Sequence, residues 1–255
     1  MTDEPTASRK ATLPALLLAV LVGFAGPASA APDNLRDGLF GARPPDGRPG
    51  AGPPVARYVS EDGEVFILDR TQPRPLLKFD GSYEVWVLQP QPAPRGDVIY
   101  KNDAGEPVLR ATRLGGVTLF TDQRPGGAAV ALAGGGLPLR LAPLGPQALL
   151  ERLAQASARA SRAARRLIPF DAEASPASSA LIADAALVAS EAVVRMARDG
   201  SRKAMGRLQK VRVVEGRKPA ANLDRGGVLR ITVTPTQGLA GRPSSERIMS
   251  AASGK

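Results

Sequence analysis

The stretch from residue 81 to residue 121 constrains the fold more than any other part of the chain. Short runs rich in β-branched and aromatic residues alternate there with Asn, Asp and Gly, and residues 102–105 read Asn-Asp-Ala-Gly. Such alternation is typical of antiparallel strands joined by tight turns. Tyr83, Val85 and Val87 would share one face of a strand, because successive side chains point to opposite sides. The sequence therefore predicts a β-meander in this region.

Aromatic residues indicate where the core of this sheet lies. Seven of the nine aromatic residues that follow residue 30 lie between Tyr58 and Phe120. Each aromatic side chain can bury about 150–250 Å². Gly- and Pro-rich sequence follows the last of the strand patterns. We therefore expect residues 57–141 to form a β unit with an aromatic core.

An amphipathic helix is predicted next, from Pro146 to Ile168. Proline is well tolerated in the first turn of a helix, and at about 100° per residue one side of this helix is apolar. The apolar side consists of Leu149, Leu150, Leu153, Ala160, Ala164, Leu167 and Ile168. A different side carries four arginines, which we term the arginine stripe: Arg152, Arg159, Arg162 and Arg166.

A second helix is expected between Ser175 and Gly200. Ser175 and Pro176 suit the N-cap and the first helical position, and glycine commonly ends helices. The main apolar face consists of Leu181, Ile182, Ala185, Val188, Ala189, Ala192, Val193 and Met196. Leu187 and Val194 form a second apolar stripe on the far side. Either the helix lies between two layers that cover both stripes, or the second stripe meets a protein partner.

Strands are expected to return after the two helices, because residues 210–214 and 228–234 are rich in β-branched residues. The sequence therefore predicts an α+β fold with a single domain over residues 57–234. Its parts are an antiparallel β-meander or sandwich-like sheet, an amphipathic two-helix hairpin (142–207) and returning C-terminal strands (208–234).

Both ends of the chain are predicted to lie outside this domain. A basic start, an apolar run and the small residues Ala28 and Ala30 match a secretory signal peptide over residues 1–30. An uncleaved N-terminal anchor is the alternative. Residues 31–56 predict a disordered linker rich in Pro and Gly, and residues 235–255 a flexible tail. We therefore expect a periplasmic or secreted protein with no transmembrane segment after signal cleavage.

The chain contains no Cys and no His. Catalytic sites of the Ser-His-Asp and Cys-His types are therefore excluded, as are metal sites with His ligands. We expect no metal and no cofactor. Without Cys an exported chain forms no disulfides, so its stability has to come from a buried core.

The excess positive charge lies in the second half of the chain. Residues 31–141 carry 13 basic and 13 acidic side chains, whereas residues 142–218 carry 14 basic and 7 acidic ones. Rows of arginine bind polyanions through forked contacts to phosphate or carboxylate. The arginine stripe, continued by basic residues over 195–210, is therefore a candidate anion-binding site, with a solvated polar face as the alternative. Phe170 is the only aromatic residue of the helical region, so we do not expect nucleic acid as a partner.

Acidic residues gather in the turns of the β unit. They are Glu61, Asp62, Asp80, Asp97, Asp103 and Glu106. Paired carboxylates can perform acid/base chemistry, but Asp beside Gly is also what a tight turn needs for backbone reasons. A carboxylate-dependent envelope hydrolase acting on cell-wall material is therefore the alternative function, with no catalytic residue assigned.

Three segments of the β unit together resemble a known family. Residues 96–105 read Gly-Asp-Val-Ile-Tyr-Lys-Asn-Asp-Ala-Gly, residues 109–112 read Leu-Arg-Ala-Thr, and residues 115–120 read Gly-Gly-Val-Thr-Leu-Phe. This arrangement is similar to the exported alphaproteobacterial proteins of Domain of Unknown Function 4908. The resemblance implies a periplasmic setting and brings no activity or cofactor. We expect a non-enzymatic binding or structural module whose basic helical half contacts an anionic envelope surface or a protein partner.

Overall fold

A computed structural model describes residues 53–254 of the chain. The predicted signal peptide, with Ala28 and Ala30, lies outside the described residues, and so does the predicted linker up to residue 52. The first strand begins at Val55, and Ala56 is fully buried in the sheet. The prediction of a linker is therefore wrong for these two residues.

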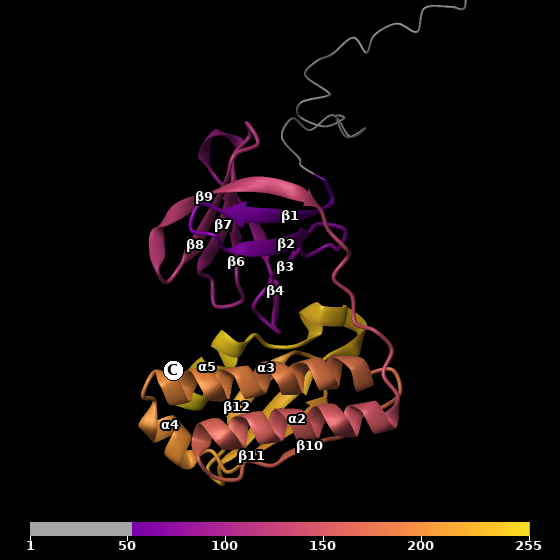
Figure 1. Ribbon diagram of the computed structural model, residues 1–255. Coiled ribbons are helices and arrows are strands. Elements are labelled where there is room, and N and C mark those ends of the chain that lie inside the picture. Colours follow the sequence, from indigo (N-terminus) through magenta and orange to yellow (C-terminus); the bar gives the residue numbers. More distant parts are fainter. Residues whose placement is uncertain (1–52, 255) are drawn as a thin grey trace, which may run out of the picture. The chain divides into compact units, whose positions relative to one another are not determined.

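The described chain begins with one antiparallel sheet of nine strands, which we term the β lobe (Figure 1). The strands lie in the order β4-β3-β2-β1-β9-β8-β7-β6-β5. Their bounds are β1 Val55–Ser60, β2 Val65–Asp69, β3 Leu76–Phe79, β4 Val85–Val87, β5 Gln89–Pro92, β6 Val98–Lys101, β7 Pro107–Ala111, β8 Val117–Thr121 and β9 Arg124–Gly135, with a short helix η1 Pro94–Gly96 before β6. Neighbours in sequence are mostly neighbours in the sheet, which confirms the predicted meander.

The sheet bends round so that its two edge strands meet. β4 ends at Val87 and β5 begins at Gln89, so Leu88 alone joins the two edges. Leu88 is fully buried, and its N–H donates to the carbonyl of Pro75 at 2.8 Å. The space that the sheet encloses is filled by large side chains, among them Tyr58, Phe66, Leu68, Leu77, Leu109 and Leu119.

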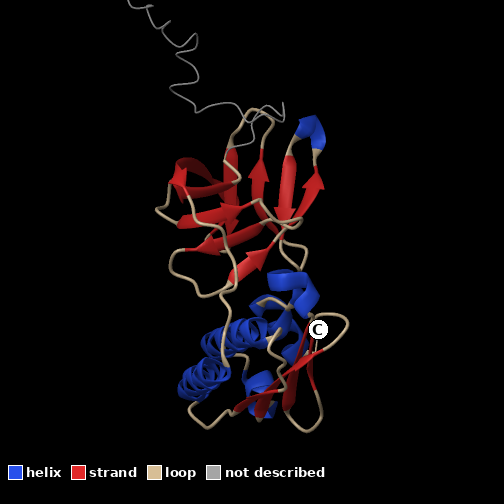
Figure 2. Ribbon diagram, turned by 90° about the vertical axis from the view of Figure 1, so that its right-hand side faces the viewer, coloured by secondary structure: helices blue, strands red, loops and turns tan. Residues whose placement is uncertain are grey.

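The rest of the described chain, which we term the helical lobe, combines helices with a sheet of four strands (Figure 2). Its strand order is β10-β11-β13-β12, with the first two pairs parallel and the last antiparallel. The bounds are α2 Pro146–Ala164, β10 Phe170–Ala172, α3 Ser179–Arg198, α4 Arg202–Arg207, β11 Lys210–Glu215, β12 Ala220–Leu223, β13 Val228–Val233, η2 Pro235–Gly241 and α5 Ser245–Ser253. The predicted α+β fold with returning strands is confirmed.

Helix α3 is the centre of the helical lobe. It connects β10 to its parallel neighbour β11, and parallel neighbours need such a crossover. α3 packs against β11 and β13 on one side and against α2 on another (Figure 1). The core around it is rich in fully buried alanines: Ala156, Ala160, Ala186, Ala189 and Ala192. No helix in the described range 53–254 combines the length and hydropathy that crossing a bilayer requires.

Helix α2 is shorter than predicted. It ends at Ala164 rather than Ile168, because Arg165 adopts a left-handed conformation with φ of 53°. The chain then folds back, and the N–H of Ile168 donates to Oγ of Ser161 at 2.9 Å. Leu167 points to solvent with 74% exposure, whereas Ile168 is fully buried. The predicted apolar face is therefore correct for Leu149, Leu153 and Ala160, but not for Leu150, which is 61% exposed within the helix.

Helix α3 also begins later than predicted. Its first residue is Ser179, whereas the sequence placed the N-cap at Ser175. The hydroxyl of Ser178 donates to the carbonyl of Ser175 at 3.1 Å, so these residues close into a turn. The predicted end is correct, since α3 stops at Arg198 and Gly200 has a φ of 70°.

The predicted flexible tail over residues 235–255 is wrong for the part of it that the structure describes. η2 and α5 occupy this segment, and α5 packs against α3 and β12. Ile248 is fully buried and Ala252 nearly so. α5 has nine residues, whereas helical periodicity is recognised over about 11–18 residues. Its short apolar face therefore gave too weak a signal.

Candidate functional site

Two residues of the arginine stripe line an open groove between α2 and α3. The groove has a volume of about 470 Å³. Arg159, Arg162 and Arg165 border it from the α2 side, and Val194 and Arg198 border it from α3. We term this site, with its four arginines, the arginine groove. Guanidinium groups from two helices are thereby brought to one surface.

Three of the four guanidinium groups in the arginine groove have no partner among the described residues. Arg162, Arg165 and Arg198 are exposed. Within residues 53–254 their side chains form no hydrogen bond and no ion pair. Like charges gathered in one place repel, and an anion between them relieves this repulsion. The arginine groove is therefore an open, positively charged surface.

Arg159 has a different environment within the arginine groove. Its Nη2 pairs with the carboxylate of Glu191 on α3. Its guanidinium carbon lies 5.1 Å from the ring centroid of Tyr83, within the range of a cation–π contact. Nη1 is buried and has no hydrogen-bond partner among the described residues, which is rare for a buried donor. Arg159 thus joins α2 to α3 and leaves one N–H unsatisfied.

The other two arginines of the stripe do not line the groove. Arg166 donates to the carbonyl of Met205 at 2.7 Å and to the carbonyl of Leu208, so it caps the end of α4. Arg152 contacts Gln155 of its own helix at 3.4 Å. Helical spacing placed all four on one edge, but Arg166 leaves that edge because the helix ends before it.

The sequence analysis did not predict Arg165 as part of the site, and it did not place Arg198 near the arginine stripe. Arg165 lay off the stripe in a regular helix, and it joins the groove because of its left-handed conformation. Arg198 was only part of the basic run, because nothing in the sequence shows that α2 and α3 are neighbours. Of the predicted partner stripe, Leu187 and Val194 are both half-buried, and Val194 lines the groove while Leu187 does not.

Four of the six acidic turn residues have partners within the β lobe. Arginines pair with three of them: Arg57 with Asp80 at 2.5 Å, Arg110 with Asp97 at 2.5 Å, and Arg124 with Asp62 at 2.7 Å. Glu106 accepts a hydrogen bond from the amide of Asn102 at 2.8 Å. No group of three or more acidic side chains in the described range could hold a metal ion. These carboxylates therefore serve turns and ion pairs.

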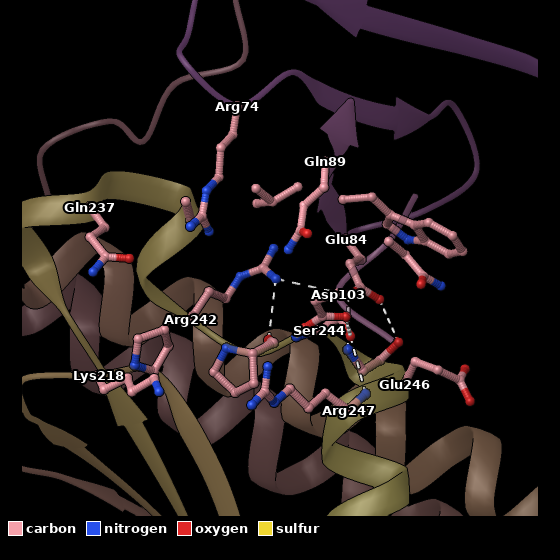
Figure 3. Close-up of a pocket in the computed structure, with 17 residues that line it drawn as sticks. Arg74, Glu84, Gln89, Asp103, Lys218, Gln237, Arg242, Ser244, Glu246 and Arg247 are labelled. Atoms are coloured by element: carbon pink, nitrogen blue, oxygen red, sulfur yellow. Dashed lines mark hydrogen bonds and ion pairs between the residues drawn. The ribbon is translucent and has the colours of Figure 1, made fainter. Parts of the chain in front are cut away.

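A second concave site, of about 240 Å³, lies where residues 242–247 meet the β lobe (Figure 3). Its floor is Arg242, whose side chain is only 1% exposed. Arg242 pairs with Asp184 of α3 and donates to the carbonyl of Val85 at 2.9 Å. Its Nη1 lies 3.8 Å from Oε1 of Glu84. We term this site the Arg242 cavity.

Two carboxylates of the β lobe occupy the N-terminal end of α5 beside this cavity. Asp103 accepts from the N–H of Ser244 at 3.0 Å, and Glu84 accepts from the N–H of Ser245 at 2.9 Å. The hydroxyls of both serines donate to the same carboxylates. Helix N-termini carry free N–H groups that favour negative charge. Burial raises the pKa of Glu84, while Arg242 and Ser245 oppose that shift.

The comparisons with known proteins identify a family and nothing more specific. A family described as a domain of unknown function, DUF4908, matches residues 34–252. This match covers more than half of the chain, so the chain belongs to that family, and the resemblance seen in the sequence is confirmed. No curated protein and no solved structure matches the chain. Family membership therefore supplies no activity, ligand or partner.

Proposed function

We propose that this DUF4908 protein is an exported, non-enzymatic binding protein whose arginine groove contacts an anionic surface of the cell envelope. The observation that carries the proposal is the set of guanidinium groups of Arg162, Arg165 and Arg198, which lack partners within the described chain. Export follows from the predicted signal peptide. Lipid headgroups and cell-wall polymers offer the phosphate and carboxylate groups that arginine binds best.

The form of the arginine groove suits an extended surface. It is open, and its arginines come from the end of α2 and the end of α3. The surrounding segment 142–218 carries twice as many basic as acidic residues, 14 against 7. Each basic residue near an anionic membrane contributes about 1 kcal/mol of attraction. Several arginines acting together therefore give measurable affinity without an enclosed pocket.

Sedimentation with vesicles and with cell-wall polymer tests this function. The protein is mixed with phosphatidylcholine vesicles that do or do not contain phosphatidylglycerol, and separately with purified peptidoglycan, over a salt series. We expect binding to the anionic material that weakens with salt, because the screening length falls from about 10 Å at 0.1 M to about 3 Å at 1 M. Absence of binding at low salt to both anionic materials would contradict the proposal.

Charge reversal locates the contact. Replacing Arg162→Glu together with Arg198→Glu should weaken binding by at least about 30-fold, the equivalent of two lost contacts of about 1 kcal/mol each. The matched control is Arg217→Glu with Arg225→Glu, which makes the same change in net charge at exposed positions outside the groove. An equal loss in both double variants would show that total charge, and not the groove, determines binding.

A further inference from the structure

The Arg242 cavity has a floor that the chain itself completes. Arg242 and Glu84 are almost fully buried, and their charged groups are hydrogen-bonded or paired with Asp184 and Ser245. Fully satisfied buried networks are rigid, because each partner restricts the others. The floor is therefore stable without a ligand. A ligand that enters the cavity meets a surface that is already fixed.

The rim of the Arg242 cavity, in contrast, carries positive groups that have no partner in the part of the chain that the structure describes. Arg74 extends into the site from the β lobe, while Lys218 and Arg247 extend from the helical lobe (Figure 3). Within residues 53–254 the side chains of these three residues form no hydrogen bond or ion pair. The charge available to a ligand on the rim is therefore positive.

The acidic residues that line the same cavity cancel only part of this charge. Glu84 lies beside Arg242, and Glu246 accepts from Arg195 at 2.6 Å. Within the described range Asp103 accepts from the neutral Ser244 and has no cationic partner, so three unpaired cations outnumber one unpaired carboxylate. A ligand that matches the free groups must be an anion, since carboxylate and phosphate oxygens accept strong hydrogen bonds from arginine and lysine.

The lining of the cavity also includes apolar side chains. Trp86 is half-buried and lines the cavity, as do Val87, Pro219 and Pro243. Pockets for drug-sized ligands measure about 300–1,000 Å³, so the 240 Å³ of this cavity suits a smaller molecule. The ligand should therefore combine an anionic group with an apolar part of roughly the size of one ring, which can lie against the indole.

We propose that the Arg242 cavity binds a small organic anion, whose phosphate or carboxylate group is held by Arg74, Lys218 and Arg247 and whose apolar part lies against Trp86. This site is separate from the arginine groove, since the two share no lining residue. The protein would then bind two kinds of ligand: a small soluble anion in the Arg242 cavity and an anionic envelope surface at the arginine groove.

Trp86 provides the measurement, because it is the single tryptophan of the chain. Its fluorescence is followed while phenyl phosphate, benzoate, inorganic phosphate or benzyl alcohol is added. We expect a saturable change with phenyl phosphate or benzoate. Benzyl alcohol lacks the charge and inorganic phosphate lacks the ring, so each should bind at least about tenfold more weakly than phenyl phosphate. No saturable change with either aromatic anion, or equal binding of inorganic phosphate, would overturn the proposal.

Substitutions on the rim test which groups hold the anion. Lys218→Ala and Arg247→Ala should each weaken binding of phenyl phosphate by about tenfold or more, as loss of a charge-assisted hydrogen bond does. Both residues are exposed, so the fold should tolerate either change. Arg217→Ala is the control, because Arg217 is exposed next to Lys218 and does not line the cavity. Unchanged binding in both rim variants, or an equal loss in the control, would overturn the assignment.

The proposals for the arginine groove and for the Arg242 cavity can be tested independently of each other. The double variant Arg162→Glu with Arg198→Glu should keep full affinity for phenyl phosphate, because neither residue lines the Arg242 cavity. Lys218→Ala and Arg247→Ala should sediment with anionic vesicles as the unchanged protein does. If the rim variants lost vesicle binding and the groove variant kept it, the cavity would be a headgroup site, and the proposal of a free small anion would be wrong.

Discussion

The core of the helical lobe is much richer in alanine than the core of the β lobe, although both cores contain large buried side chains. Phe66, Leu77 and Leu109 are completely buried inside the bent sheet. The core of the helical lobe contains fully buried alanines such as Ala156 and Ala160. Large side chains bridge the space that a curved sheet encloses, whereas helices that carry alanine can approach closely. The two lobes should therefore be vulnerable to opposite substitutions.

The two lobes also use arginine differently. In the β lobe Arg57, Arg110 and Arg124 each pair with a carboxylate, in keeping with equal numbers of acidic and basic residues over 31–141. The segment 142–218 has a surplus of basic residues, so some arginines are left without partners. The arginine groove is where the structure gathers several of them.

The largest expected effect comes from Arg242, which contacts elements of both lobes. Arg242→Met leaves Asp184 without its ion pair and removes the positive charge beside buried Glu84. Breaking a buried pair in this way costs about 3–5 kcal/mol, which urea-induced unfolding measures. Arg230→Met, at an exposed position of β13, is the control. A loss below about 1 kcal/mol would show that Arg242 contributes no more than a surface ion pair does.

Core substitutions of opposite size test the contrast between the lobes. Leu109→Ala should destabilise the β lobe by about 2–5 kcal/mol, because it leaves a cavity. Ala160→Leu should destabilise the helical lobe by about 1–3 kcal/mol, because the added atoms have no space. Both changes are measured as free energies of unfolding in urea.

The same two changes, Leu→Ala and Ala→Leu, are made at exposed positions to separate the effect of burial from the effect of residue type. Leu114→Ala changes a leucine that is 91% exposed, and Ala154→Leu changes an exposed alanine of α2. Each should alter the free energy of unfolding by less than about 0.5 kcal/mol. If Ala160→Leu left stability unchanged or increased it, the packing of the helical core would be looser than its buried alanines indicate.

A smaller effect is expected from pH in the β lobe. The side-chain hydrogen bond from Arg110 lowers the pKa of Asp97 below its ordinary value. A carboxyl group of this kind contributes stability above its unfolded pKa, and the contribution is lost as the pH falls through the folded pKa. Asp97→Asn should therefore lower Tm at neutral pH, and the difference from the unchanged protein should shrink below about pH 4.

A second aspartate controls for the loss of one negative charge. Asp122 is exposed at the turn before β9. Asp122→Asn should leave both Tm at neutral pH and its dependence on pH close to those of the unchanged protein. A difference in Tm for Asp97→Asn that stayed constant as the pH fell would mean that Asp97 does not contribute through its charge.

The fold was predictable where local sequence carries the signal. Strands alternate every second residue and long helices every third or fourth, so the β-meander, α2, α3 and the returning strands could be read from the chain. α5 could also have been found. Pro243 is followed by Ser244, Ser245 and Glu246, and Ser244 accepts the N–H of Arg247 as an N-cap. That capping signal was stronger than the periodicity of the short helix.

The candidate sites were predictable only in part. The arginine stripe pointed to the correct helix and to Arg159 and Arg162, because helical spacing is a local property. It could not show that α2 ends before Arg166 or that Arg198 of α3 lies across the groove. The Arg242 cavity gave no signal at all, since its lining comes from segments far apart in the chain.

The amino-acid sequence was enough to establish the class of fold, the succession of β unit, two long helices and returning strands, the absence of Cys and His chemistry and the half of the chain that holds the surplus charge. Which charges are paired and which are free depends on the tertiary structure. Asp103 and Ser244 are 141 positions apart, and Glu84 and Ser245 are 161 apart, yet each pair is hydrogen-bonded. Local patterns extend over a few turns or strands, whereas such pairs depend on how distant elements pack, and that packing formed both candidate sites.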